Sequence, residues 1–226
     1  MPGILYVVST PIGNLKDITY RAVSILENAD IIAAEDTRTS RILLSHYKIN
    51  TKIVSYHEHN ERFRTESLCK ELENGKNIAL ITDAGTPCIS DPGYVLVNEV
   101  RKRGIQIYPI PGPSSLTTAL SISGLPTEQV LYTGFLPRKK GRKTRFEFLS
   151  SLPVTIVIFE SPHRVIKTIM DIESFMGDRV VSVCRELTKK FEEVIIGPVS
   201  EVHEKLNVST PKGEFVILVA REGYSL

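Results

Sequence analysis

The chain has 226 residues, of which 42% are hydrophobic and 24% charged, and its formal net charge is +2. This composition is typical of a soluble globular protein, and the length allows one large domain or two of about 100 residues. No apolar run approaches the ~18 residues of a membrane span, so we expect no membrane association. No signal or transit peptide precedes the first strand, and the three cysteines lack metal-ligand spacing, which favours reduced thiols. We therefore expect a cytoplasmic protein.

The first half of the chain alternates short apolar runs with segments that have the spacing of amphipathic helices. Asp17 can cap the first of these helices, and Gly75 and Gly104 end two others. Strands that alternate with helices predict a doubly wound, mostly parallel sheet. The predicted strands are 4–8, 29–34, 53–56, 78–81 and 105–110, and the helices that follow the one capped by Asp17 cover 37–47, 61–74 and 94–103.

The second half is also α/β, but its predicted strands are more closely spaced, which indicates hairpins and a mixed sheet. Pro111-Gly112-Pro113 interrupts the chain, Ser114 can cap a helix that runs to 123, and Ser161-Pro162 predicts another helix start. We therefore expect two α/β domains, 1–113 and 114–226, with the link between them in the range 111–127. The strands predicted in the second domain are 130–134, 154–159, 180–184, 194–197 and 215–220.

The most informative connection follows the predicted strand at 78–81. The loop from 82 to 93 contains two glycines and two prolines, and it is roughly twice as long as the usual connection between a strand and a helix. In an open α/β sheet, ligands bind beyond the carboxyl ends of the strands. Gly85 permits a ligand to approach the backbone, while Pro87 and Pro92 stiffen the loop. An ordinary turn is the alternative, but the length favours a functional loop.

Polar residues at the ends of other predicted strands extend this pattern. Segment 9–14 follows the first strand and forms either a tight turn or one wall of a ligand site. Asp36 follows the second strand, where its favoured role is to cap a helix, and Arg38 faces either solvent or a phosphate. In the second half, His163 and Arg185-Glu186 occupy comparable positions, with a helix cap and a surface ion pair as the respective alternatives.

Three kinds of site are disfavoured by the spacing of residues. Segment 9–14 lacks the G-x-G-x-x-G fingerprint of dinucleotide binding, and the chain has no P-loop, so we expect neither a common Rossmann dehydrogenase nor a nucleotide hydrolase. His57 and His59 alternate along an extended segment, but a third ligand at suitable spacing is missing. We therefore predict no metal site.

Positive charge is concentrated in one segment of the second half. Six of the 15 basic residues in 113–226 lie within 138–145, and no acidic residue accompanies them. A charge run is commonly a solvated loop. Here Phe135 precedes the run and Phe146 and Phe148 follow it, and aromatic rings beside cations suit base stacking combined with phosphate contact. The candidate RNA-binding residues are Arg138, Lys139, Lys140, Arg142, Lys143 and Arg145.

Eight motifs, taken together and in order, resemble the tetrapyrrole methylase superfamily. Within it they are similar to the rRNA small subunit methyltransferase I branch. Each motif is weak by itself, but as a set they are specific and span nearly the whole chain. The motifs are STPIGN (9–14), AEDTR (34–38), ITDAGTPCISDPG (81–93), PGPSS (111–115), GFLPRK (134–139), ESPHR (160–164), RELTK (185–189) and KGEF (212–215).

The resemblance implies two α/β domains with a cleft between them that binds S-adenosylmethionine, and it implies a homodimer. The loop at 84–89 would contact the methionine end of the cofactor, and segments of the second domain would close over it. The implied cofactor contacts are Pro11, Ile12, Ala84, Gly85, Thr86, Pro87, Ile89, Ser114, Ser115, Glu160, Ser161, Arg185, Glu186, Gly213 and Glu214.

The resemblance also implies a reaction, the 2′-O-methylation of a cytidine ribose in the decoding region of 16S rRNA, as free RNA or in the small ribosomal subunit. Two alternatives stay open: a C-methyltransferase for a precorrin-type tetrapyrrole, and a non-catalytic RNA-binding assembly factor on the same fold. We expect Asp83 to shape its loop by accepting hydrogen bonds from backbone N–H groups. A ribose hydroxyl is a weak nucleophile that a nearby base or cation assists, and the candidates are Glu35, Asp36, Arg38, His163 and Glu186.

Overall fold

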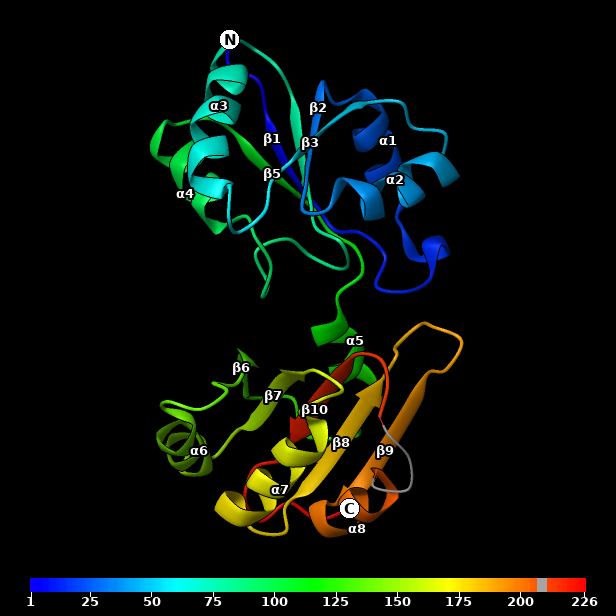
Figure 1. Cartoon of the computed structure of the whole chain (residues 1–226), viewed down its shortest axis with the longest axis vertical. Coiled ribbons are helices and arrows are strands. Elements are labelled where there is room, and N and C mark those ends of the chain that lie inside the picture. The colour runs from blue at the N-terminus through cyan, green and yellow to red at the C-terminus, as the bar shows by residue number, and fades with distance from the viewer. Residues whose placement is uncertain (207–210) are drawn as a thin grey trace. The chain divides into compact units, whose positions relative to one another are not determined.

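The computed structural model describes residues 1–206 and 211–226, and the chain divides into two compact units, Met1–Ser114 and Ser115–Leu226 (Figure 1). Within the described ranges, no helix is both long and apolar enough to span a membrane.

The first unit is a five-stranded parallel sheet with helices on both faces, as the alternating pattern predicted. Its strand order is β3-β2-β4-β1-β5, and every neighbouring pair is parallel. The elements are β1 (Leu5–Val8), a 3-10 helix η1 (Leu15–Asp17), α1 (Tyr20–Asn28), β2 (Ile31–Ala34), α2 (Thr37–His46), β3 (Lys52–Ser55), α3 (Glu61–Glu73), β4 (Ile78–Ile81), α4 (Tyr94–Lys102) and β5 (Ile107–Ile110).

Two apolar layers hold this sheet between its helices. Leu68 of α3 and Leu96 of α4 pack with Leu80 on one face, whereas Leu26 of α1 and Leu44 of α2 belong to the core on the other. All four residues of β2 and all four of β4 are buried, because strands covered on both faces require continuous apolar runs.

The second unit contains a five-stranded mixed sheet, which confirms the second half of the fold prediction. Its order is β6-β7-β10-β8-β9; β6 and β7 are parallel, and the other pairs are antiparallel. Strands β8 and β9 form the predicted hairpin. The elements are α5 (Ser115–Ile122), β6 (Val130–Phe135), α6 (Arg142–Ser150), β7 (Thr155–Glu160), α7 (Val165–Met176), β8 (Val180–Arg185), β9 (Glu193–Pro198), α8 (Val199–Leu206) and β10 (Phe215–Val219).

Two predicted helix starts are wrong. Asp17 lies in η1, and the cap of α1 is Thr19, whose hydroxyl accepts a hydrogen bond from the Ala22 N–H at 3.1 Å. Asn14 caps η1 instead, so a short helix competes for the residues before α1. Helix α7 begins at Val165 and not after Ser161, because residues 162–164 form a turn, in which the Ser161 carbonyl accepts hydrogen bonds from the N–H groups of Arg164 at 3.0 Å and Val165 at 3.1 Å.

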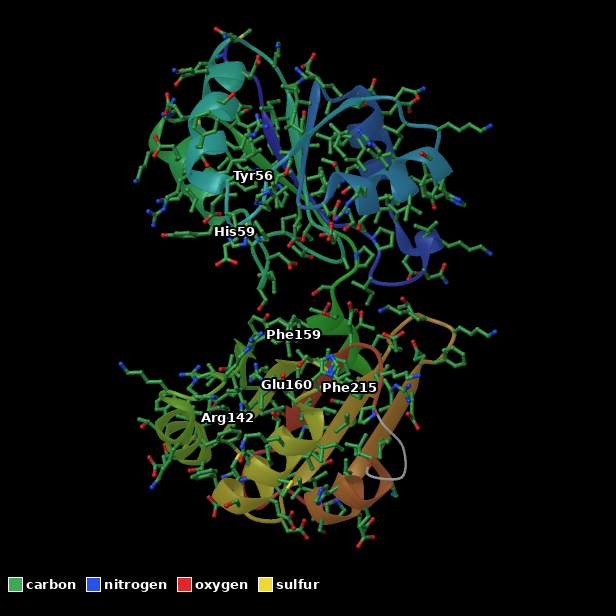
Figure 2. The ribbon with its side chains drawn as sticks, in the orientation of Figure 1. Tyr56, His59, Arg142, Phe159, Glu160 and Phe215 are labelled. Atoms are coloured by element: carbon green, nitrogen blue, oxygen red, sulfur yellow. The ribbon has the colours of Figure 1, made fainter. Side chains whose placement is uncertain are left out.

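Tyr56, which directly follows β3, connects α3 and α4 through one buried hydroxyl; its position is labelled in Figure 2. Its oxygen accepts a hydrogen bond from the Leu96 N–H in the first turn of α4, and it lies 3.2 Å from the Thr65 hydroxyl of α3. Because Gly93, which caps α4, has no side chain, Tyr56 supplies the partner that a cap would provide. We expect Tyr56→Phe to lower the free energy of unfolding by about 1–3 kcal/mol, since it leaves a buried N–H unpaired.

Urea denaturation measures this loss, and pH provides a second readout. Burial raises the pKa of Tyr56 to about 12. Above about pH 10 the unfolded chain loses this proton first, so the free energy of unfolding falls as pH rises from about 10 toward 12. Tyr56→Phe removes that component. Tyr20→Phe, the same change at a side chain that is 97% exposed, is the matched control and should alter neither quantity.

Candidate active site

In the first unit, the loops after β1 and β4 are joined by a short antiparallel bridge. The Thr10 N–H donates to the Gly85 carbonyl at 2.8 Å, and the Gly85 N–H donates to the Thr10 carbonyl at 3.0 Å. The Thr10 hydroxyl also donates to the Thr82 carbonyl at 3.1 Å. The long loop at 82–93 is therefore fixed to the first turn of the chain at the carboxyl edge of the parallel sheet.

Hydroxyl groups extend these connections to the segment after β5. The Ser9 and Thr86 hydroxyls lie 2.9 Å apart, and the Thr86 hydroxyl donates to the Pro113 carbonyl at 3.2 Å. A Cβ atom at Gly112 would lie 3.1 Å from the Cβ of Ser9, so only glycine fits comfortably where these two segments cross. Sequence reasoning did not identify Ser9, because its partners are distant in the chain; the signal available was its place in STPIGN.

The loop after β4 places the candidate cofactor contacts along this edge. Gly85 has a φ of +86°, and a Cβ atom there would lie 3.4 Å from Ile12 Cγ2. Pro11, Ile12 and Pro87 are buried, Thr86 and Ile89 are half-buried, and Ala84 is exposed. Ser114 and Ser115 stand on either side of the division between the two units.

Carboxylates connect the ends of β2 and β4. A Glu35 oxygen accepts a hydrogen bond from the Thr82 hydroxyl at 2.6 Å, and an Asp83 oxygen accepts from the Asp36 N–H at 3.0 Å. Asp83 thus does bind a backbone N–H, but on the neighbouring strand end and not within its own loop as expected. Partial burial raises the pKa of Asp83 above its ordinary value.

Asp36 caps α2, as predicted, by accepting a hydrogen bond from the Arg38 N–H at 2.8 Å. The Arg38 guanidinium binds the same carboxylate, with a shortest Nη2–Oδ2 distance of 2.6 Å. This hydrogen-bonded pair lowers the pKa of Asp36 to about 2. Asp36 is consequently a poor proton acceptor at neutral pH.

In the second unit, three motif segments meet at one end of the mixed sheet. Phe215, the first residue of β10, is in register with Glu160 of β7 and with Arg185 of β8 (Figure 2). Residues 160–164, 185–189 and 212–214 therefore lie beside one another within this unit. The Glu160 carboxylate is enclosed, with a side chain that is 0% exposed, whereas His163 is exposed in the turn before α7.

Lys189 holds two of these segments together. Its ammonium group lies 2.9 Å from a Glu186 oxygen and 2.9 Å from a Glu214 oxygen, and the Glu214 N–H donates to Glu186 at 3.0 Å. A Cβ atom at Gly213 would lie 2.4 Å from Glu186 Cγ, so this crossing requires glycine. Although partial burial opposes it, the Lys189 and Glu214 donors hold the pKa of Glu186 below its ordinary value.

Arg185 does not form the surface pair with Glu186 that the sequence left open. Its Nε donates to the Lys212 carbonyl at 2.8 Å, and its Nη1 lies 3.3 Å from a Glu193 oxygen. Lys189, which sequence reasoning did not select, could have been found from its place in the RELTK motif.

Some side chains of the basic segment at 138–145 are exposed to solvent, and Arg142 is buried in the core. Arg138, Lys139 and Lys140 are exposed in the turn before α6. Arg142 is only 7% exposed and pairs with Asp171 at 2.7 Å, so its assignment to an RNA-binding surface is wrong. The reason is helical periodicity: Arg142, Phe146 and Leu149 all lie on the buried face of α6. Lys143 is exposed and lies 3.7 Å from Glu147, and Arg145 donates to the Thr133 hydroxyl at 2.7 Å.

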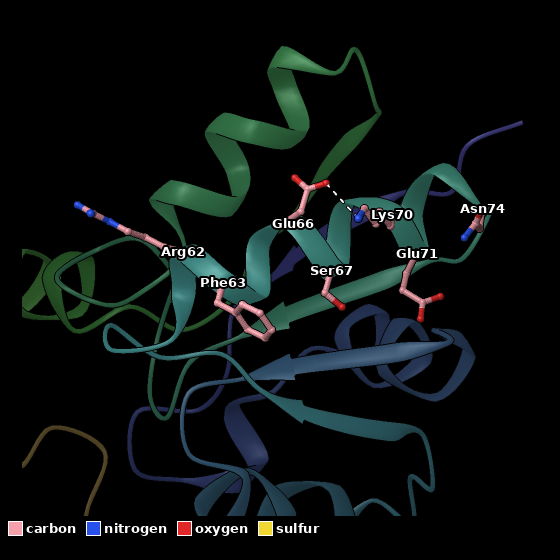
Figure 3. A pocket seen from close by; sticks show the side chains of 7 residues that line it. All are labelled: Arg62, Phe63, Glu66, Ser67, Lys70, Glu71 and Asn74. Carbon is pink, nitrogen blue, oxygen red and sulfur yellow. Dashed lines mark ion pairs between the residues drawn. The ribbon is translucent and has the colours of Figure 1, made fainter.

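Two further features carry none of the candidate residues. The His57 and His59 rings lie 5.9 Å apart, and in the described part of the chain no group of three His, Cys, Asp or Glu side chains could hold a metal ion. A hollow on the outer side of α3 is shown in Figure 3, with a Glu66–Lys70 ion pair along it. Its lining is Arg62, Phe63, Glu66, Ser67, Lys70, Glu71 and Asn74.

Solved structures share the fold at low sequence identity. A cobalt precorrin-4 methyltransferase of cobalamin biosynthesis aligns with a TM-score of 0.72 and 20% identity, covering 96% of this chain and 94% of the other. A diphthine synthase aligns with a TM-score of 0.73 and 13% identity, covering 96% and 90%. These likenesses show a common architecture.

Relatives with closer sequences carry one name, ribosomal RNA small subunit methyltransferase I. The protein of Halalkalibacterium halodurans is 49% identical over 98% of this chain and 77% of its own length. That of Escherichia coli O157:H7 is 46% identical over 96% and 77%, and that of Thermotoga maritima is 43% identical over 96% and 98%. A sequence profile for Tetrapyrrole (Corrin/Porphyrin) Methylases matches residues 4–203, and the chain belongs to this family.

Proposed function

We propose that the protein is an S-adenosylmethionine-dependent methyltransferase that methylates the ribose 2′-oxygen of a cytidine in the decoding region of 16S rRNA. The observation that carries this proposal is identity of 43–49% along nearly the whole chain to relatives named as methyltransferases of small-subunit ribosomal RNA. The exposed cations of Arg138, Lys139 and Lys140 support an RNA substrate, since phosphate contacts dominate affinity for nucleic acids.

The two strand-end clusters supply the proposed cofactor contacts. When bound, S-adenosylmethionine supplies a methyl group activated by a sulfonium. The first cluster suits it because Gly85 adds no side chain at the edge of the sheet, and because the carboxylates of Glu35 and Asp83 favour a cationic group nearby. The proposed contacts are Pro11, Ile12, Ala84, Gly85, Thr86, Pro87, Ile89, Ser114 and Ser115, with Glu160, Ser161, Arg185, Glu186, Gly213 and Glu214 from the second unit.

The proton of the ribose hydroxyl requires an acceptor of suitable pKa. The Asp36 and Glu186 carboxylates are paired with cations, those of Arg38 and Lys189, which makes both weaker bases, so Glu35 and His163 are the proposed acceptors. Arg38 then acts with Asp36, either to orient the start of α2 or to hold a phosphate next to the acceptor ribose.

RNA binding by the second unit is proposed to combine charge with stacking. Phe135 at the end of β6 is 55% exposed, and its ring lies 6.0 Å from that of Phe159 in an edge-on arrangement. An exposed ring immediately before Arg138, Lys139 and Lys140 suits an unpaired base whose phosphates the cations contact. The cations follow one another on an exposed turn, which favours RNA over a tetrapyrrole, whose carboxylates require cations in a cleft.

The test is a transfer assay with labelled S-adenosylmethionine. Substrates are 16S rRNA and small subunits from a strain that lacks the chromosomal gene, with a tetrapyrrole precursor offered in parallel. We expect label in the RNA, and mass mapping should place it on a cytidine 2′-oxygen. Label in the tetrapyrrole would select the C-methyltransferase alternative. Absence of cofactor binding by calorimetry would select the non-catalytic RNA-binding alternative.

Homodimerisation and a cytoplasmic location are proposed on the same resemblance. Light scattering during gel filtration tests the first, and fractionation of cells that express a tagged chain tests the second.

A further inference from the structure

The groups that bind the Glu160 carboxylate belong to the second unit. One oxygen accepts a hydrogen bond from the Ser161 N–H at 2.8 Å and lies 3.3 Å from Arg164 Nε. The other oxygen accepts from the Thr168 hydroxyl at 2.7 Å. Because its side chain is 0% exposed, Glu160 acts on neighbouring residues and does not itself reach a ligand in solution.

The Thr168 hydroxyl connects Glu160 to Arg142 through two hydrogen bonds. The Thr168 side chain is 0% exposed and has a single hydroxyl proton, which it donates to Glu160. Its oxygen accepts from Arg142 Nη2 at 2.8 Å, and Arg142 Nε pairs with Asp171 at 2.7 Å. The direction of each hydrogen bond is therefore fixed from the guanidinium to the hydroxyl to the carboxylate.

Arg142 and Arg164 both bind the backbone immediately before the exposed cations at 138–140. Arg142 Nη1 donates to the Pro137 carbonyl at 3.1 Å, and Arg164 Nη2 donates to the Leu136 carbonyl at 2.5 Å. With Glu160 and Asp171 as the acidic members, the cluster contains two anions and two cations. Balanced and fully hydrogen-bonded clusters of this kind hold their members rigidly, whereas loss of one member leaves a buried charge unpaired.

We propose that Thr168 and Arg142 are positioning residues for the cofactor. A carboxylate is planar, so holding one oxygen of Glu160 through Thr168 also fixes the oxygen that binds Ser161. Ser161 is thereby held in the orientation that contacts S-adenosylmethionine. The inference rests on the proposed function. In place of a direct contact between the Glu160 side chain and the cofactor, it assigns Glu160 an indirect effect through Ser161.

The experiment compares the dissociation constant of S-adenosylhomocysteine, the unreactive product, across purified variants of the full chain. Thr168→Val removes the hydroxyl at almost constant volume and is expected to weaken binding about tenfold or more, because a charged, buried acceptor loses its partner. Thr168→Ser keeps the hydroxyl and should restore the wild-type constant. Arg142→Lys retains the charge but not the guanidinium geometry, and should weaken binding in the same sense.

Ile169→Val is the matched control. Ile169 is the next residue of α7 and is also 0% exposed, so this change lowers stability without touching the hydrogen bonds. Denaturation midpoints measured in parallel show how far each variant is destabilised. We expect Ile169→Val to bind the product as the wild type does. If Thr168→Val does not fold, the comparison of Arg142→Lys with Ile169→Val decides the question.

Equal binding by Thr168→Val and Ile169→Val would overturn the inference, as would Thr168→Ser binding no better than Thr168→Val. In both cases the wild type still binds the product, and the proposed function stands. A wild-type protein that does not bind the product removes the proposed function, and the inference falls with it.

Discussion

Gly85→Val is expected to weaken S-adenosylmethionine binding by at least about a hundredfold, or ~2.7 kcal/mol. Gly85 has a φ of +86°, which a β-branched residue adopts only with strain. A Cβ atom added at Gly85 would lie 3.4 Å from Ile12 Cγ2, already in van der Waals contact, so the two further methyl groups of valine have little room. Relief of the strain requires rotation of the peptide, which breaks the two hydrogen bonds to Thr10 at 2.8 and 3.0 Å.

Calorimetry measures the cofactor affinity, and denaturation measures the stability of the same variant. Gly104→Val is the matched control, since Gly104 also has a positive φ of +69° but nothing lies within 4 Å of its Cβ position. It should reproduce the backbone strain and leave the dissociation constant unchanged. Undiminished affinity in Gly85→Val would mean that the loop at 82–93 is only a connection, and the proposed site in the first unit would have to be abandoned.

Sequence patterns correctly predicted strands and helix starts that depend on residues close together in the chain. The apolar run at 78–81 predicted a strand because a strand buried on both faces has to be continuously apolar, and β4 is the central strand. Asp36 predicted a helix start because its side chain meets an N–H only two residues away. The cap of α1 was misplaced because Asp17 and Thr19 both have capping side chains, and the residue spacing alone does not show that η1 comes first.

The contacts that the sequence did not predict join residues that are far apart in the chain. Asp83 binds the N–H of Asp36, 47 residues away, and no periodicity reports such a pair. Arg142 was grouped with its basic neighbours because charge is counted along the chain, whereas its exposure depends on the face of α6 that it occupies. Its partner Asp171, 29 residues away on α7, became visible only in the folded unit.

Charge reversal of Arg138, Lys139 and Lys140 to glutamate is expected to lower affinity for 16S rRNA by roughly a hundredfold or more. If each cation contacts one phosphate, the slope of log affinity against log salt should fall by about 2, since each contact to single-stranded RNA contributes about 0.7. Cofactor affinity should stay at the wild-type value, because none of the three side chains belongs to the Glu160 cluster.

The control for this prediction reverses three exposed cations of the first unit, Lys48, Arg101 and Lys102, which changes the net charge by the same amount. If RNA binding responded only to net charge, both triple variants would lose affinity equally, and long-range attraction would explain the whole effect. A loss confined to the 138–140 variant requires contact at that segment. Unaltered cofactor affinity of this variant would also show that the three exposed cations contribute to RNA binding and not to cofactor binding.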